Sequence, residues 1–305
     1  MGHSDLHHGR GHNHGAGNHN RAFALGVALN TIYVGFEAAT GLIVGSLALL
    51  ADAGHNASDV LSLLLAWGAA RLGKTAPTLR RTYGLRRTTI LASLANAVLL
   101  LIVVGAIGWE AVGRLASPRS VPGGALIWVA GLGVLINAAT ALMFLKGRHR
   151  DLNIKGAFLH MAADAAVSLG VVIAGVLIKL TGQLWIDPAL SLLIVMVIAA
   201  GTWGLLRDSF NLAVDAVPSG IDPRAVENYL ASLPGVREVH DLHVWAMSTT
   251  EVALTAHLVK PDGKLDDALL EKAAAELRRR FGVHHAVLQF EQGREACLQA
   301  ACGAS

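Results

Sequence analysis

Long apolar stretches separated by short polar connections dominate the chain up to Asp215. A transmembrane helix needs about 20 consecutive apolar residues to cross a hydrocarbon core of about 30 Å. Six stretches are long enough, at about 22–44, 47–72, 88–116, 123–146, 154–180 and 186–206. The pattern predicts an α-helical membrane protein with six transmembrane helices, the first two joined by a tight turn at Gly45 and Ser46.

A different pattern follows Asp215, where hydropathy falls and prolines interrupt the chain. Asp222 followed by Pro223 is typical of a helix start and predicts a helix to Ser232. Alternating β-rich runs and an amphipathic run predict strands at 236–247 and 252–259, a helix at 266–281 and a last strand at 285–290. The order αββαβ predicts a small α+β domain with its helices on one face of a three-stranded sheet.

Four regions are therefore expected along the chain. They are a His-rich tail at 1–20, a six-helix membrane domain at 21–215, the α+β domain at 216–295 and a C-terminal tail at 296–305. The first tail is rich in Gly, Asn and His and predicts disorder, either as a loose metal collector or as a solvated segment without a specific role.

Composition and charge agree with a membrane protein and predict its orientation. Hydrophobic residues make up 53% of the 305 residues, charged residues only 15%, and the mean hydropathy is +0.49. Lys and Arg concentrate in the connections 71–87 and 146–155, so both termini are expected on the cytoplasmic side of the membrane. This membrane is expected to be a bacterial inner (plasma) membrane. No cleavable signal peptide is expected before the first span. Topology and lipid contact explain the net charge of +3, which indicates no nucleic-acid partner.

One short pattern occurs twice inside the apolar stretches, as His55-x-x-x-Asp59 and His160-x-x-x-Asp164. Ionisable residues within a span are costly and usually functional. Positions i and i+4 share one helix face, so each pattern directs an imidazole and a carboxylate to one point. Two opposed faces would supply four ligands for a tetrahedral divalent ion, with zinc as the first candidate. A single polar pair could instead hold neighbouring helices together, but its duplication favours a shared ion site.

Other polar residues are weaker candidates. Asp52 is a candidate acceptor for the second ring nitrogen of His55, or else a helix-end carboxylate in a wet vestibule. Glu37 could line an ion path. The remaining residues are more typical of contacts between helices (Asn30, Asn96, Asn137) or of surfaces and strands (His243, His284, His285).

These features together resemble the cation diffusion facilitator family, close to its zinc-exporting members. The resemblance is carried by the six spans, the two His-Asp patterns, Tyr83-Gly84 and the Val-His-Asp-Leu-His-Val-Trp run at 239–245, and it covers nearly the whole chain after the tail. It implies a homodimeric, proton-coupled antiporter that moves cytosolic Zn²⁺ outward and carries a ferredoxin-like cytoplasmic domain. It also implies a transport site at His55, Asp59, His160 and Asp164, and His55 in place of an Asp resembles the zinc-selective subgroup.

Further residue roles follow from the same resemblance. His240, His257 and Glu291 match regulatory zinc ligands of the cytoplasmic domain, and Gln289 replaces a histidine of some relatives, which implies one metal there. Cys297 and Cys302 are similar to C-terminal cysteines of vertebrate zinc transporters; idle thiols are the alternative, and no disulfide is expected in a reducing compartment. Arg87 and Asp215 match a charged interlock between the third span and the cytoplasmic domain. The connection 72–87 contains no histidine, so no interfacial metal site is expected there.

A mechanism and its alternatives follow from the ligand types. His and Asp must lose their protons to hold a metal, so protons and zinc compete and antiport is expected. Two other readings stay open: a membrane metalloenzyme with a zinc-activated water, and a passive metal channel or sensor. Four ligands and no evident separate general base disfavour the enzyme, because a hydrolytic zinc site normally has three protein ligands and one open position.

Overall fold

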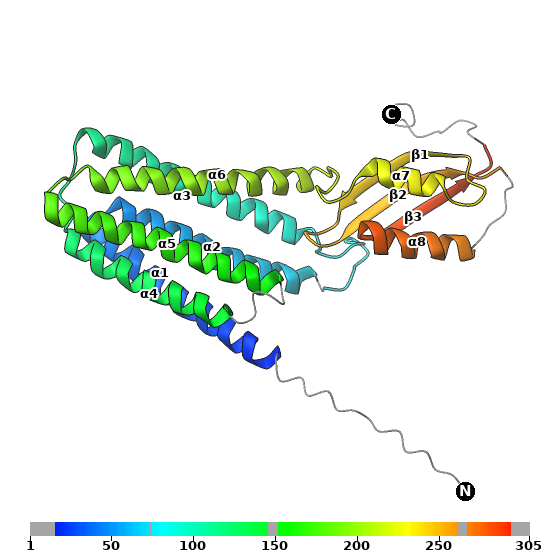
Figure 1. Ribbon diagram of the computed structural model, residues 1–305. Coiled ribbons are helices and arrows are strands. Elements are labelled where there is room, and N and C mark those ends of the chain that lie inside the picture. The colour runs from blue at the N-terminus through cyan, green and yellow to red at the C-terminus, as the bar shows by residue number, and fades with distance from the viewer. Residues whose placement is uncertain (1–15, 74, 146–151, 262–266, 294–305) are drawn as a thin grey trace, which may run out of the picture. The chain divides into compact units, whose positions relative to one another are not determined.

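The computed structural model describes residues 16–73, 75–145, 152–261 and 267–293 (Figure 1). Six long helices stand where the six spans are expected, which confirms the predicted fold class. Their bounds are Ala16–Val44 (α1), Leu47–Gly73 (α2), Thr88–Ala116 (α3), Gly123–Phe144 (α4), Leu152–Thr181 (α5) and Ile186–Ala213 (α6).

Four of these helices have described residues that are long and apolar enough to cross a membrane. They are Thr88–Ala116, Gly123–Met143, Phe158–Thr181 and Ile186–Ala213. Within α1 the side chains are described from Ala28, and the section Ala28–Val44 is apolar. The ionisable residues of α2 lower the hydropathy of that helix.

The start of α1 differs from the expected end of the tail. The tail was expected to be disordered to Asn20, whereas α1 begins at Ala16. A helix that is anchored by an apolar section propagates backward at little cost, because each added residue gains one backbone hydrogen bond. Residues 1–15 lie outside the described part, and so do Cys297 and Cys302.

Backbone contacts divide the chain into two units, one formed by Met1–Val60 with Ile102–Ala199 and the other by Leu61–Leu101 with Ala200–Ser305. In the first unit, α1 lies beside α4 and α4 beside α5 (Figure 1). Gly133 of α4 permits the closest approach, because a Cβ there would lie 2.3 Å from the Tyr33 hydroxyl of α1. Tyr33 is buried and also bonds to the Val129 carbonyl at 3.3 Å, so α1 and α4 are tied together at this level.

Helix α2, which carries the first His-Asp pattern, begins at a buried carboxylate from α6. Asp187 accepts hydrogen bonds from the Ser46 hydroxyl at 2.6 Å and from the backbone amides of Leu47 at 2.9 Å and Ala48 at 3.3 Å. The first amides of a helix have no partner within it, and a negative charge suits this end of the helix dipole. Asp187 thus fixes where α2 starts.

The second unit contains the α+β domain, and the predicted order αββαβ is confirmed. Its elements are Pro223–Ala231 (α7), Glu238–Ala246 (β1), Val252–Val259 (β2), Asp267–Phe281 (α8) and Val283–Glu291 (β3). The predicted start of α7 is confirmed, since the Asp222 carboxylate accepts a hydrogen bond from the backbone amide of Arg224 at 3.0 Å. Strand β2 is central, antiparallel to β1 and parallel to β3.

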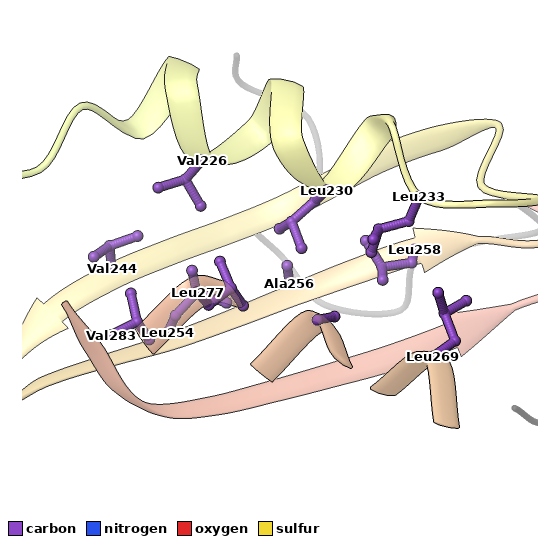
Figure 2. Packing of buried hydrophobic residues seen from close by; sticks show 11 residues of the cluster. Val226, Leu230, Leu233, Val244, Leu254, Ala256, Leu258, Leu269, Leu277 and Val283 are labelled. Atoms are coloured by element: carbon purple, nitrogen blue, oxygen red, sulfur yellow. The ribbon is translucent and has the colours of Figure 1, made fainter. Parts of the chain in front are cut away.

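One hydrophobic core joins both helices of this domain to the sheet (Figure 2). Leu230 of α7 and Leu277 of α8 pack in the same buried cluster as Leu254, Ala256 and Leu258 of β2. These β2 positions alternate along the strand and so face one side of the sheet. Both helices therefore cover that side, and the intervening residues of β2 face the other.

Candidate metal centre

Three residues of the two His-Asp patterns, His55, Asp59 and Asp164, have ligand atoms within 4.8 Å of one another, and His160 lies beside them. His55 and Asp59 lie on α2, and His160 and Asp164 lie on α5. His55 Nε2 is 3.8 Å from Asp59 Oδ2 and 3.4 Å from Asp164 Oδ1, while His160 Nε2 is 3.3 Å from Asp59 Oδ2 and 3.6 Å from Asp164 Oδ2. Each imidazole faces the carboxylate of its own helix and that of the other, so the patterns form one cluster.

The side chains of this cluster are buried to different extents, and some of their oxygens are left free to bind an ion. The Asp164 side chain is 2% exposed, whereas His160 is 43% exposed, so the cluster opens on the His160 side. Buried Oδ2 atoms of Asp59 and Asp164 have no hydrogen-bond partner among the described residues. Buried oxygens without a partner are costly and are normally satisfied by hydrogen bonds, water or an ion. The nitrogen and oxygen donors around one point fit a divalent cation such as zinc.

Behind the cluster lies a network of buried polar groups. Asp52 accepts hydrogen bonds from Ser168 at 2.8 Å and from Asn56 at 3.4 Å, and among the described residues it receives none from His55. The prediction that Asp52 accepts a hydrogen bond from the His55 ring is therefore wrong for the described residues, in which Asp52 is held by Ser168 and Asn56 instead. The alternative of a wet vestibule is also wrong, because Asp52 is fully buried. Glu37 is fully buried too and accepts the Tyr33 hydroxyl at 2.7 Å.

A second cluster lies on the sheet. His240 Nε2 is 3.0 Å from Glu291 Oε2, His257 Nδ1 is 2.9 Å from Glu291 Oε1, and the two rings are 5.1 Å apart. His240 pairs directly with His257 across β1 and β2, and Glu291 lies near the end of β3 beside Val259. His257 alternates with the core residues Ala256 and Leu258, so the cluster lies on the face of the sheet away from the helices.

The sheet cluster also has free ligand capacity. The His240 and His257 side chains are 6% and 10% exposed, and neither Nδ1 atom makes a hydrogen bond to a described residue. Although His257 Nδ1 lies close to Glu291, the pair is not aligned as a hydrogen bond. Gln289 does not enter the cluster as a ligand; its amide donates to Glu291 Oε1 at 3.0 Å. Two imidazoles and one carboxylate fit a single zinc ion.

Sequence patterns missed one member of this cluster, Asp241. Its side chain is 8% exposed and lies 3.6 Å from His257 Nε2 and 2.9 Å from His243 Nε2. The register of β1 against β2 shifts between His240 and His243, and Asp241 adopts a left-handed φ of 52°. Asp tolerates this conformation better than most residues do. The irregularity turns the Asp241 carboxylate toward His257, and the HDLH run was the only available signal for it.

The comparisons with known proteins identify the fold that carries these clusters. Residues 23–212 match the family "Cation efflux transmembrane domain", and residues 218–293 match "Cation efflux protein, cytoplasmic domain". This chain is a member of the cation diffusion facilitator family. It is therefore an integral membrane transporter with a cytoplasmic domain, and not an enzyme.

Curated relatives agree over almost the full length. The chain is 34% identical to the metal cation efflux system protein CzcD of Cupriavidus metallidurans over 93% of this chain and 90% of the relative. It is 35% identical to the zinc transporter ZitB of Escherichia coli over 88% and 86%. It is 30% identical to a cadmium, cobalt and zinc/H(+)-K(+) antiporter of Bacillus subtilis over 92% of each. These relatives support metal cation efflux, including zinc, as the transport activity of this facilitator.

The charged pair Arg87 and Asp215 is also formed in this facilitator. The Arg87 guanidinium donates to the Asp215 carboxylate, and both side chains are about half exposed. The neighbouring Arg86 pairs with Glu251 at 2.8 Å. Exposed pairs contribute at most about 1 kcal/mol each, so they orient the chain near the start of α3 more than they stabilise it. His243, His284 and His285 lie at the surface as expected.

Proposed function

We propose that this facilitator exports zinc from the cytosol in exchange for protons, and that His55, Asp59, His160 and Asp164 hold the transported ion. The meeting of two His-Asp pairs from α2 and α5 carries this proposal. Two imidazoles and two carboxylates supply a tetrahedral set for Zn²⁺ as substrate. The relative from Escherichia coli is a zinc transporter, which supports the choice of metal.

Proton exchange follows from the chemistry of these ligands. Imidazole nitrogen and carboxylate oxygen each bind either a proton or a metal ion, so zinc loading displaces protons from the cluster and protonation releases zinc. Entry of protons from the outside would return the emptied site to its inward-facing form. The Bacillus subtilis relative is named as an antiporter of metal ions with H⁺ and K⁺, which supports exchange of metal for protons.

Proteoliposome flux is the decisive test. Purified protein would be reconstituted with a zinc-sensitive dye inside the vesicles, and zinc uptake would be measured with and without an imposed pH gradient. We expect an acidic interior to accelerate zinc entry and zinc entry to release protons from the vesicles. Zinc flux that does not change with the pH gradient and moves no protons would identify a passive channel and overturn the antiport proposal.

Orientation and assembly belong to the same proposal. We infer that the protein is a homodimer in a bacterial plasma membrane with both termini in the cytoplasm. The match to a cytoplasmic domain and the basic connections next to the spans support this orientation. The chain has only two cysteines, Cys297 and Cys302, both near the C-terminus. A membrane-impermeant maleimide should therefore label inverted vesicles and spare intact spheroplasts.

The sheet cluster would serve as a regulatory site. Zinc bound by His240, His257 and Glu291 would fix the end of β3 against β1 and β2, and so stiffen the cytoplasmic domain. A ligand that binds one conformation of this domain more tightly than another shifts the equilibrium toward the first, by an amount set by the difference between the two affinities. Raised cytosolic zinc would then promote its own export.

A further inference from the structure

The connection between α2 and α3 is a folded segment that encloses a basic cavity. Thr78 and Arg81 exchange two backbone hydrogen bonds of 3.0 Å, and the Gly84 amide bonds to the Arg81 carbonyl at 2.9 Å. Gly84 has a φ of 71°, and a Cβ there would lie 2.9 Å from the Thr75 carbonyl oxygen. The turn therefore needs glycine at this position. A cavity of about 460 Å³ opens beside it within the second unit.

The lining of this cavity combines cations with an apolar wall. Four arginines of the connection line it: Arg80, Arg81, Arg86 and Arg87. The apolar side is supplied by Trp245 of β1, by Met247 just after this strand, and by Leu91 of α3. None of the residues that line the cavity is acidic. The cavity therefore suits a ligand with one anionic group and an adjoining apolar part.

Two of the four arginines pair with acidic residues, and the other two form no ion pair within the described part of the chain. Arg86 pairs with Glu251, and Arg87 pairs with Asp215. Arg80 and Arg81 are exposed, and their guanidinium groups make no ion pair with any described residue. Guanidinium groups bind phosphate oxygens through paired hydrogen bonds, which gives both strength and geometry. Arg80 and Arg81 therefore leave two positive charges available for a phosphate at the cavity.

The sequence puts the cavity at the depth of lipid headgroups. Arg86 and Arg87 directly precede Thr88, the first residue of a helix apolar enough to cross a membrane. The same connection exposes apolar side chains to solvent: Leu79 fully, at 104%, and Tyr83 at 49%. Amphipathic and apolar side chains beside basic residues are typical of segments that lie in a membrane interface.

We propose that this cavity binds the phosphate headgroup of an anionic phospholipid through Arg80 and Arg81. The glycerol part of the lipid lies against Trp245 and Met247, and its acyl chains run toward α3 and the bilayer. A zwitterionic lipid carries a cationic group next to its phosphate, which the arginines repel, so anionic headgroups are preferred. The bound lipid lies beside the Arg86–Glu251 and Arg87–Asp215 pairs, which join this connection to the rest of the second unit.

Native mass spectrometry of the full-length protein tests this proposal. The protein would be released from nanodiscs that contain equal phosphatidylglycerol and phosphatidylcholine, and retained lipids would be counted for the wild type and for Arg80→Ala/Arg81→Ala. At about five- to sixfold per removed arginine, phosphatidylglycerol affinity should fall by about thirtyfold in the double variant. Arg80→Lys/Arg81→Lys should restore part of it, because lysine keeps the charge without the paired geometry.

A matched control separates the cavity from charge in general. Arg224→Ala/Arg278→Ala removes two exposed arginines of α7 and α8, outside the cavity lining, and should retain phosphatidylglycerol as the wild type does. Equal retention in the cavity variant and the control would overturn the proposal, and so would equal retention of the two lipids by the wild type. Full displacement of the lipid by millimolar inorganic phosphate would assign the cavity to a soluble anion and also overturn it. None of these outcomes depends on zinc transport.

Discussion

The membrane cluster and the sheet cluster present similar candidate metal ligands in different settings. In the membrane domain, the ligands project from two separate helices and His160 is 43% exposed. On the sheet, the ligands come from three hydrogen-bonded strands and His240 is 6% exposed. A helix can shift as a rigid body, whereas neighbouring strands are held by their shared backbone hydrogen bonds. The first setting suits an ion that must enter and leave, and the second suits an ion that is retained.

The two clusters also differ in the groups that contact their histidine rings. On the sheet, Asp241 contacts His257 directly, at 3.6 Å. In the membrane domain, the buried carboxylate Asp52 is held by Ser168 and Asn56 and does not bond to His55. Groups that hold a ligand ring usually raise metal affinity by fixing its orientation. The absence of such a contact among the described residues around His55 would lower retention of the ion, which is consistent with a transport site.

Loss of one membrane ligand should have the largest effect. Asp164→Asn keeps the shape of the side chain but replaces a charged oxygen ligand by a neutral one. Loss of a group that merely hydrogen-bonds to a metal ligand typically lowers metal affinity or activity by about 10- to 100-fold. Because Asp164 is itself a proposed ligand, we expect zinc transport in proteoliposomes to fall by at least about 100-fold. The control is Asp208→Asn, the same change at an exposed position of α6. Wild-type flux in Asp164→Asn would remove this residue from the site.

Removal of both sheet histidines, His240 and His257, should abolish zinc binding at the sheet cluster but not zinc transport. In the Asp164→Asn background, which silences the membrane cluster, calorimetry should show one zinc per chain that is lost in His240→Ala/His257→Ala. The matched control, His284→Ala/His285→Ala, changes two exposed histidines of the same domain and should keep the ion. In otherwise wild-type protein, the His240→Ala/His257→Ala change should reduce only the stimulation of flux by cytosolic zinc. Equal zinc stoichiometry in the two double variants would show that the sheet does not bind zinc through these residues.

The contribution of Asp241 should be smaller. Asp241→Asn preserves the left-handed backbone, since Asn adopts it as readily as Asp does, but it removes the negative charge beside His257. We expect zinc affinity of the sheet cluster to fall about tenfold, measured by competition with a chelating dye. Thermal unfolding in zinc-free buffer checks that the fold is retained. If affinity does not change, His257 is held by the sheet alone.

The smallest expected effect is a change of selectivity at the membrane cluster. His55→Asp replaces a nitrogen ligand by an oxygen ligand and should raise the ratio of cadmium to zinc flux. A shift of about 1 kcal/mol in relative affinity corresponds to about fivefold in this ratio. Parallel uptake assays with the two metals measure it. An unchanged ratio would show that helix spacing, and not ligand type at position 55, sets selectivity.

The sequence predicted those parts of the molecule in which local spacing determines the geometry. The i, i+4 pattern on α2 and α5 predicted that His55, Asp59, His160 and Asp164 share a centre, and the structure places these four side chains beside one another. Hydropathy correctly located the helices. What the sequence missed depends on contacts across the fold. The partners of Asp52 come from the facing helix α5 as well as from α2. The position of Asp241 beside His257 depends on a register shift in β1 that residue preferences alone do not predict.

The carboxylate at the start of α2 restricts how this helix can move. Asp187 of α6 binds one hydroxyl and two amides there, and all these groups are buried. If α2 slid along its axis relative to α6, a buried charge would lose its donors, and breaking such a buried arrangement costs about 3–5 kcal/mol. Tilting about the Ser46 end keeps these bonds. We therefore expect α2 to move by swinging about a pivot at Asp187, with a displacement that grows with distance from that pivot.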